Sequence, residues 1–203
     1  MNVDKMEARR VLKQLYKDVW AYTIPKKENL KIRKASSSSL YGEITFGALD
    51  KLIAYLDLNE KDVFFDLGSG VGKVVLQVAM TSPVKKAIGV ELSKSRFHEA
   101  VGVLDEATKE KHVARRKCEF RNENILETDL SKATVIYSCS TAFPMVFMKK
   151  LAKKLSEAKK PLRIVTTQEL PERTGLVLVE KLKLDMSWAR GTTVYVFANK
   201  AAE

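Results

Sequence analysis

Apolar residues recur along this 203-residue chain first at helical spacing and then in short runs that alternate with helical segments. Near the N-terminus they share one helix face and predict an amphipathic helix over residues 3–20. That stripe consists of Val11, Leu12, Leu15, Tyr16, Val19 and Trp20. Residues 22–40 lack such a stripe and are predicted to form a basic, serine-rich arm or loop. A second helix is predicted over residues 46–56.

From residue 62 onward the pattern changes to short apolar runs separated by helical segments. The runs predict strands near residues 63–65, 87–90, 117–121, 134–138, 162–166, 176–184 and 192–198. The intervening helices include one capped by Ser93 and one opened by Pro144. Their expected inner faces are Phe97, Ala100, Val101 and Leu104, and Val146, Met148, Leu151 and Leu155.

This alternation predicts an α/β fold with a mostly parallel sheet, helices on both faces and a closing antiparallel hairpin. The hairpin turn is expected around residues 189–191. We expect one domain over residues 41–203, preceded by a basic helical extension over residues 1–40.

The charge balance adds a bias toward polyanionic or acidic partners. The chain has 36 Lys and Arg against 25 Asp and Glu, a formal net charge of +11. The excess concentrates in residues 1–35 and on the predicted helix face from Lys149 to Lys160, where nucleic-acid contact is one interpretation and a solvated surface the other. With 45% apolar residues, the composition excludes a disordered or fibrous protein.

Cysteine usage indicates a reducing, intracellular setting. Cys118 and Cys139 are the two cysteines, too few for a disulfide scaffold. The sequence does not decide between nucleus and cytoplasm, and a secreted effector that acts inside a host cell fits the same pattern. Two histidines without close cysteine spacing argue against a metal site. No membrane span is expected, because the longest uncharged stretch, residues 133–148, is shorter than the roughly 20 residues a helix needs.

A glycine loop and a following acid carry the candidate chemistry. The loop runs Asp66-Leu67-Gly68-Ser69-Gly70-Val71-Gly72 at a predicted strand-to-helix junction, where ligands approach the carboxyl ends of parallel strands. Its G-x-G-x-G spacing differs from the G-x-G-x-x-G that anchors a pyrophosphate. Glu91 ends the next strand and can accept both hydroxyls of a ribose. A ribose and an amino-acid portion without a pyrophosphate describe S-adenosylmethionine.

Two stretches bring in a family resemblance. Tyr41-Gly42-Glu43-Ile44-Thr45-Phe46 and the segment from Asp62 to Ala79 resemble the disruptor-of-telomeric-silencing family of histone lysine methyltransferases, which lack a SET domain. The similarity extends from about Leu40 to Ala198. It implies a seven-stranded, Rossmann-like class I methyltransferase fold, S-adenosyl-L-methionine as cofactor and S-adenosyl-L-homocysteine as product. It also implies N-methylation of a lysine in a protein, with a histone, a nucleosome or another basic protein as substrate.

The resemblance also assigns roles to individual residues. Tyr41 and Glu43 would belong to a loop that closes over the cofactor, and Glu91 would bind the ribose. The methionine part would lie along Asp66, Gly68, Ser69, Gly70, Val71 and Gly72. Asn124 and Ile125 would lie beside the adenine. The lysine channel would be lined by Phe143, Trp188 and Tyr195, with Tyr41 and Cys139 as further candidate catalytic residues.

Several positions depart from the family pattern. Cys139-Ser140 stands where the family has an Asn pair, Ile44 replaces a hydroxyl residue and Lys73 replaces a Gln. Two other functions therefore remain open. An RNA or DNA methyltransferase suits the basic surface, although residues 138–141 lack the Asn/Asp-Pro-Pro-Tyr/Phe signature of base N-methylation. A non-catalytic module with the cofactor fold that binds nucleic acid or chromatin is the third hypothesis.

Overall fold

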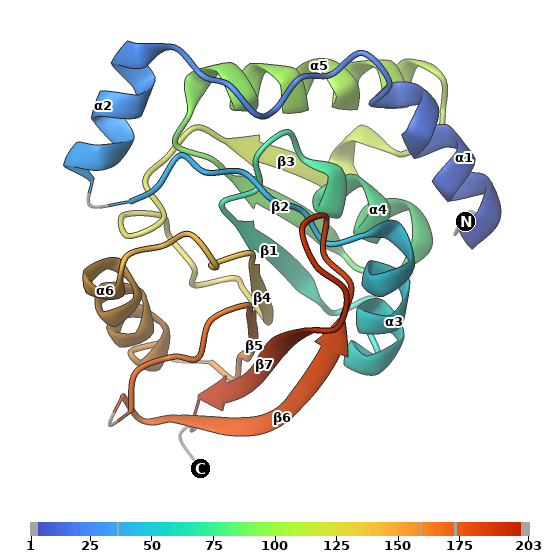
Figure 1. The fold of residues 1–203 in the computed structure, drawn as a ribbon. Helices are drawn as coiled ribbons and strands as arrows, with labels where there is room; N and C mark the ends of the chain where they lie inside the picture. Colours follow the sequence, from blue (N-terminus) through green and yellow to red (C-terminus); the bar gives the residue numbers. More distant parts are fainter. Residues whose placement is uncertain (1–3, 36, 159, 173, 200–203) are drawn as a thin grey trace.

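One mixed sheet forms the centre of the molecule (Figure 1). The computed structural model describes residues 4–35, 37–158, 160–172 and 174–199. Within this part, seven strands follow the order β3-β2-β1-β4-β5-β7-β6. They are β1 (Val63–Leu67), β2 (Lys86–Val90), β3 (Cys118–Arg121), β4 (Val135–Ser138), β5 (Arg163–Thr166), β6 (Leu176–Leu184) and β7 (Thr192–Asn199). Strands β1 to β5 are parallel, and β7 runs antiparallel to both β5 and β6. The predicted α/β fold class is confirmed.

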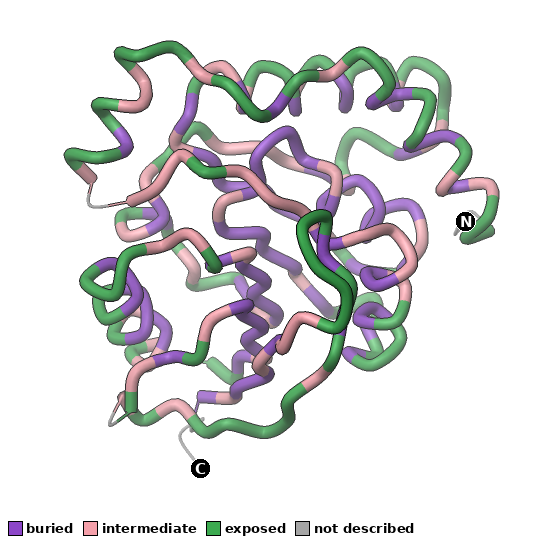
Figure 2. Tube along the Cα trace, viewed as in Figure 1, coloured by how far each residue is buried: buried purple, intermediate pink, exposed green. Residues whose placement is uncertain are grey.

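Helices cover both faces of the sheet, with two separate apolar clusters beneath them (Figures 1 and 2). They are α1 (Lys5–Leu15), α2 (Lys26–Lys34), α3 (Phe46–Leu56), α4 (Lys73–Thr81), α5 (Lys94–Lys109) and α6 (Met145–Ser156), with a 3₁₀ turn, η1 (Arg115–Lys117). Helices α1, α3, α4 and α5 contribute to one cluster, and α6 packs on the other. The N-terminal helix α1 is therefore part of the main core. Among the described helices, none is long and apolar enough to cross a membrane.

The first 40 residues differ from the prediction in two ways. The helix predicted over residues 3–20 begins at Lys5, capped by Asp4, and ends at Leu15, while residue 3 lies outside the described residues. Trp20, expected on its inner face, is 65% exposed. The arm predicted as a loop contains the helix α2. Glu28 in its first turn and Lys and Arg in its last turn interact favourably with the helix dipole and so stabilise it. Ile32 is the one buried residue of α2, so the sequence of this helix has no apolar stripe from which it could be predicted.

The inner faces of α5 and α6 are rotated from the predicted phase. On α5 the buried residues are Arg96, Ala100, Val103, Leu104 and Ala107, whereas Phe97 and Val101 are half-buried. On α6, Phe147 is buried and Val146 is 58% exposed. The phase shifts because an apolar stripe about 100° wide leaves the flanking positions undecided by sequence. The predicted helix over residues 46–56 matches α3.

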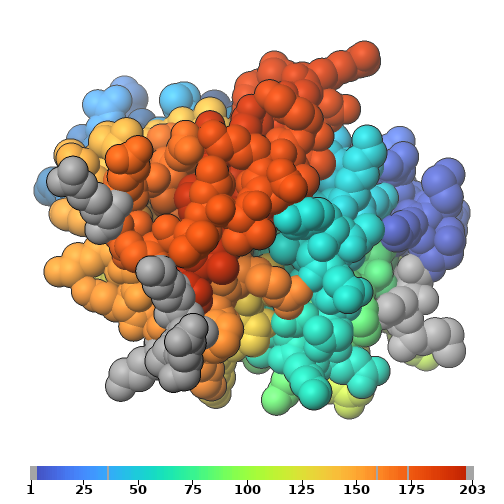
Figure 3. All heavy atoms as spheres, turned by 90° about the horizontal axis from the view of Figure 1, so that it is seen from below, coloured from blue at the N-terminus to red at the C-terminus, as the bar shows by residue number. Residues whose placement is uncertain are grey.

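The connection between β6 and β7 reaches back across the molecule to the segment before α3. The backbone N–H of Thr45 donates to Asp185 O at 3.0 Å, and that of Ser187 donates to Glu43 O at 2.7 Å. Seen from below, the orange-red surface of β6 borders the cyan surface of α3 (Figure 3). These contacts bring residues 41–45 and 185–188 together at the carboxyl ends of the parallel strands.

Candidate active site

The glycine loop between β1 and α4 turns back on the end of β2. The backbone N–H groups of Gly68 and Ser69 donate to Val90 O at 2.9 and 3.0 Å. Gly70 has φ +55°, and a Cβ at this position would clash with the ring of Tyr41. Glycine is thus required here both for the backbone conformation and for the close approach of Tyr41.

Two adjoining cavities open at this loop, with volumes of about 290 and 240 Å³. Both are lined by Tyr41, Gly42, Gly68 and Cys139. The first cavity also has Glu91, Arg96, Ile125, Phe143 and Trp188 in its wall. The second has Glu43, Asp66, Ser69, Lys73 and Tyr137. Together they approach the size of a pocket for a drug-sized ligand, and they lie where ligands bind in open α/β sheets.

Two buried acids mark the ends of β1 and β2. Glu91 Oε2 accepts the Gly70 N–H at 2.9 Å and Oε1 accepts the Ser93 N–H at 2.8 Å. Burial raises the pKa of Glu91, and the opposing effect of these N–H groups and of Arg96 does not cancel the rise. Burial and the neighbouring Glu91 also raise the pKa of Asp66, well above its usual value. A negative charge on Glu91 therefore disfavours ionisation of Asp66 at the same edge of the sheet.

Asp66→Asn is expected to stabilise the folded protein at neutral pH. A carboxyl group with a raised pKa favours folding when protonated, and that contribution is lost as the pH rises through the folded-state pKa. The variant should therefore melt a few degrees higher at neutral pH, at about 2–4 °C for each kcal/mol gained. The difference in Tm between the variant and the original protein should become smaller at pH values below about 3.9, the pKa of an unfolded-state aspartate. Melting curves over this pH range test it, and a lower Tm of the variant at neutral pH would contradict it.

Tyr41, Glu43 and Lys73 form a chain of polar contacts along the second cavity. The Tyr41 hydroxyl donates to Glu43 Oε1, and Lys73 Nζ donates to Glu43 Oε2 at 2.8 Å. Burial, followed by the charge of Glu43, raises the pKa of Tyr41 far above its usual value, so Tyr41 is a neutral donor. The positive charge of Lys73 balances the negative charge of Glu43. This ion pair links residues 41–43 to the start of α4, which follows the glycine loop.

Aromatic side chains and a thiol also line the first cavity. The Trp188 ring lies directly on Gly42, where a Cβ would clash with it, and the side chain is 44% exposed. The Phe143 ring lies over Gly68 and packs on Phe147 with centroids 4.8 Å apart. Burial raises the pKa of Cys139 to about 12, so this residue is a neutral thiol rather than a nucleophilic thiolate.

Comparisons with known proteins identify the family. The family model described as "Histone methylation protein DOT1" matches residues 20–183. The chain belongs to the DOT1 family. This match begins at residue 20 and so includes α2, whereas the resemblance was expected to start near Leu40.

Several lysine N-methyltransferases are similar to part of this chain. A Caenorhabditis elegans histone-lysine N-methyltransferase, H3 lysine-79 specific, is 32% identical over 149 residues, covering 68% of this chain and 15% of that protein. A Drosophila melanogaster protein of the same name is 37% identical over 70 residues, 34% of this chain and 4% of the relative. This chain thus matches a small part of these long relatives. A protein-lysine N-methyltransferase of Saccharolobus islandicus is 30% identical over 124 residues, covering 61% of this chain and 71% of that protein.

Solved structures share the fold at lower identity. An RNA methyltransferase from Salinibacter ruber, in complex with S-adenosyl-L-homocysteine, has a TM-score of 0.63 at 24% identity and covers 77% of this chain and 94% of that one. A putative RNA methyltransferase from Pyrococcus horikoshii has a TM-score of 0.58 at 16% identity, covering 100% and 99%. These likenesses establish the class I methyltransferase architecture that was predicted for the sequence.

Most residues assigned from the DOT1 resemblance meet at the two cavities. Tyr41, Glu43, Asp66, Gly68, Ser69, Glu91, Ile125, Cys139, Phe143 and Trp188 line one or both. Gly70 lies beneath Tyr41, Gly72 caps α4, and the buried Val71 accepts a hydrogen bond from Tyr16 through its carbonyl.

Asn124 and Tyr195 lie outside the walls of both cavities, as far as the described residues define them. The Asn124 amide is used locally, because Nδ2 donates to Glu127 Oε1 and Oδ1 accepts the Leu126 N–H, each at 3.0 Å. The Tyr195 ring faces the α6 side of the sheet and stacks on Phe197 with centroids 6.4 Å apart. Of the three residues expected to line a lysine channel, Phe143 and Trp188 therefore lie in the wall of the first cavity, and Tyr195 does not.

Sequence reasoning missed Arg96, a buried cation in the first cavity. Its side chain is 5% exposed and its guanidinium lies 4.8 Å from the Tyr41 ring centroid. A signal was present, since Arg96 precedes Ala100 by four residues and shares its helix face. An arginine on a buried face needs acceptors, and these come from distant segments.

Proposed function

We propose that this chain is an S-adenosylmethionine-dependent protein lysine N-methyltransferase that acts on a histone or another basic protein. The observation that carries the proposal is that one cavity joins the buried carboxylate of Glu91 to the aromatic residues Phe143 and Trp188. The first end suits a ribose and the second a cationic or amine-bearing side chain. The name of the Saccharolobus relative, protein-lysine N-methyltransferase, supports the same substrate class.

The residues present fit the cofactor. Each oxygen of Glu91 accepts one backbone N–H and keeps a lone pair for a ribose hydroxyl. Ser69 lines the second cavity, and its buried Oγ, which lies close to Gly89, has no hydrogen-bond partner among the described residues. Buried Ile125 gives the first cavity an apolar wall for an adenine. When bound, S-adenosylmethionine supplies an electrophilic methyl group on a positively charged sulfur.

The aromatic wall would position the target lysine. Phe143 and the half-exposed Trp188 line this end of the first cavity, where their rings would favour an alkylammonium and exclude water from its alkyl chain. Methyl transfer depends mainly on the alignment of the amine with the methyl group, which a narrow aromatic opening restricts. Cys139 and Tyr41, both held neutral, add no competing charge at this opening.

Transfer of a radiolabelled methyl group tests the activity and the substrate class together. The substrates are intact nucleosomes, free histones, total protein and total RNA, each incubated with labelled S-adenosylmethionine. We expect label in protein, stable to RNase and recovered as methyl-lysine after acid hydrolysis. Label in RNA alone would overturn the substrate class, and cofactor binding without transfer to any of the four would favour the non-catalytic module.

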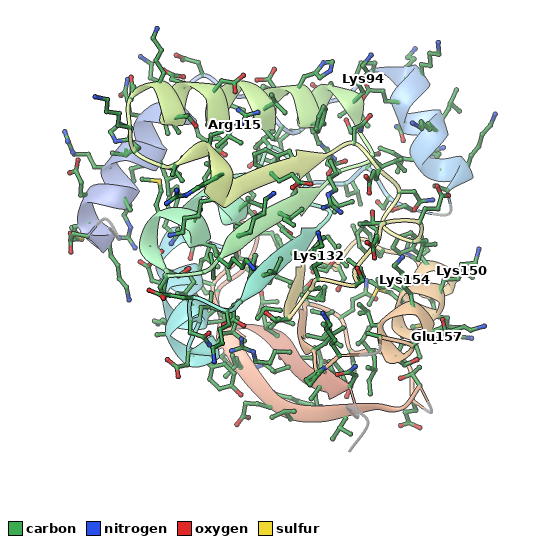
Figure 4. The ribbon with its side chains drawn as sticks, turned by 180° about the vertical axis from the view of Figure 1, so that it is seen from behind. Lys94, Arg115, Lys132, Lys150, Lys154 and Glu157 are labelled. Carbon is green, nitrogen blue, oxygen red and sulfur yellow. The ribbon has the colours of Figure 1, made fainter. Side chains whose placement is uncertain are left out.

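We also propose that the basic surface contacts nucleic acid. Helix α2 carries five exposed cations, Lys26, Lys27, Lys31, Arg33 and Lys34. The α6 face contributes less than predicted, because Lys154 Nζ donates to the carbonyls of Leu126 and Thr128 and Lys159 lies outside the described residues. Figure 4 shows Lys150 projecting outward from α6 and Lys154 toward the loop that holds these carbonyls. The contact is therefore centred on α2.

Neutralising α2 is expected to weaken the salt dependence of DNA binding. The variant combines Lys26→Gln, Lys27→Gln and Lys34→Gln, because removal of residues 1–35 would also remove the core residues of α1. Each lost phosphate contact should lower the slope of log affinity against log salt by about 0.9. Fluorescence anisotropy of a labelled DNA duplex across salt concentrations measures this slope.

A control with the same net charge separates a local contact from a general field. It replaces three exposed lysines away from α2, namely Lys51, Lys61 and Lys85, by glutamine. The control should leave the slope nearly unchanged. Equal slopes for the two variants would place the contact elsewhere or show that these charges are only solvated.

The cysteines support an intracellular, reducing compartment, which we propose for this protein. Cys118 is buried in β3, and Cys139 lies at the cavity wall; both are free thiols. Thiols persist in such a compartment, which includes the nucleus and the cytoplasm.

A further inference from the structure

Residues 21–35 and 37–40, here called the strap, contribute to the wall of the first cavity. Ile32, Ser37, Ser38 and Leu40 of the strap line that cavity. Among its described residues, Ala21 and Ile32 are the buried ones, so little apolar contact holds the strap down. Figure 4 shows α2, the helical part of the strap, beside the start of α5, where Lys94 is labelled.

Arg96 on α5 joins the two ends of the strap. Its Nε donates to Ala21 O at 2.9 Å, and its Nη2 donates to Ser39 O at 2.8 Å. The same guanidinium lies over the ring of Tyr41, which in turn lies on Gly70. The buried side chain of Arg96 thereby holds both ends of the strap in place. It also contacts Tyr41, which follows the strap and packs on the glycine loop.

Glu28 holds the middle of the strap. Its Oε2 accepts hydrogen bonds from Ser93 Oγ at 2.7 Å, Ser95 N at 3.1 Å and Ser95 Oγ at 2.8 Å. These donors lie at the N-terminus of α5, where the helix dipole favours a carboxylate. Burial opposes the charge of Glu28, but the hydrogen bonds from Ser93 and Ser95 outweigh burial and lower its pKa, so the group is ionised at neutral pH. The backbone of Ser93 also donates to Glu91, so the contact adjoins the proposed ribose site.

We propose that Arg96 and Glu28 are positioning residues of a gated strap, in which Arg96 is the fixed hinge and Glu28 the releasable latch. Release of Glu28 from α5 would lift α2 and open the first cavity, while Arg96 keeps the strap ends in place. The ligand's identity as S-adenosylmethionine rests on the proposed function. The latch itself rests on the contacts of Glu28 and on the shortage of apolar burial in α2.

Limited trypsin digestion tests the latch without any ligand. The lysines and arginines of α2 become cleavable when the strap lifts, because proteolysis follows the population of the open state. Glu28→Gln should speed cleavage within residues 26–34 about tenfold, since it loses hydrogen bonds to an ionised group. Glu99→Gln, a matched change at an exposed acid of α5, should cleave as the original protein does. Equal cleavage of Glu28→Gln and Glu99→Gln would overturn the latch.

Stopped-flow binding of S-adenosylhomocysteine tests the gate. Glu28→Gln should raise both the association and the dissociation rate, each by about fivefold or more, with a smaller change in affinity. A role limited to overall stability would not accelerate both rates. Unchanged rates in a variant that binds would overturn the gate, whereas absence of binding in the original protein would overturn the proposed cofactor and leave the trypsin result standing.

Arg96→Lys provides the second variant. Lysine keeps the positive charge near Glu91 but cannot hydrogen-bond to both strap carbonyls with a planar fork. We expect faster tryptic cleavage within residues 26–34, and a loss of S-adenosylhomocysteine affinity that Glu28→Gln does not show. Affinity equal to that of the original protein would remove Arg96 as a positioning residue.

Discussion

Glu91→Ala is expected to weaken binding of S-adenosylhomocysteine by at least about a hundredfold. A hydrogen bond to a charged group contributes about 1.5–3 kcal/mol, and the carboxylate has a free lone pair on each oxygen for two ribose hydroxyls. Burial strengthens these bonds because water does not compete for Glu91. Isothermal titration calorimetry of the purified variant gives the affinity directly.

Stability has to be measured beside affinity for this variant. Alanine leaves the N–H groups of Gly70 and Ser93 without their acceptor, which costs about 1–3 kcal/mol for each group that stays buried. Glu91→Gln keeps one carbonyl acceptor and should lose less stability, while still losing the charge. Glu99→Ala, an exposed acid on α5, is the control. Unchanged affinity in folded Glu91→Ala would remove Glu91 from the site.

Trp188→Ala is expected to lower the single-turnover rate of methyl transfer by more than about tenfold while changing cofactor affinity much less. An interaction that aligns the amine acts mainly in the transition state, so its loss appears in the rate. The side chain is 44% exposed and packs on Gly42, so its removal should cost less stability than the roughly 3–5 kcal/mol of a buried tryptophan. Single-turnover rates, calorimetry and thermal melts on one preparation separate these effects.

Tyr195→Ala is the informative comparison. The ring packs on Phe197 beneath the α6 side of the sheet, so truncation should lower Tm and leave the rate of the folded fraction unchanged. A folded, cofactor-bound Trp188→Ala variant with full activity would exclude Trp188 from the channel. A selective rate loss in Tyr195→Ala would instead extend the channel beyond the two cavities toward β7.

The sequence alone determined the sheet, the glycine loop and the acid that follows it. The strands β1, β2, β4 and β5 are buried apart from the first residue of β1, β2 and β5, and such apolar runs stand out from their polar flanks without any tertiary information. Parallel strands place their carboxyl ends at one edge, so Asp66 and Glu91 had to meet there once the strand order was parallel. The family resemblance then added Tyr41, Glu43 and Trp188, which the strand pattern does not bring together.

Only the tertiary structure decided which side chains form contacts between segments that are distant in the sequence. The helix α2 lacks an apolar stripe and is held by Glu28 and Arg96, whose partners lie 57 to 75 residues away along the chain. Contacts over such separations leave no local period in the sequence. The directions of Asn124 and Tyr195 likewise depend on neighbours in space, which turn the first to Glu127 and the second to Phe197. Local periodicity thus specified which residues approach the site, and side-chain packing decided which of them line it.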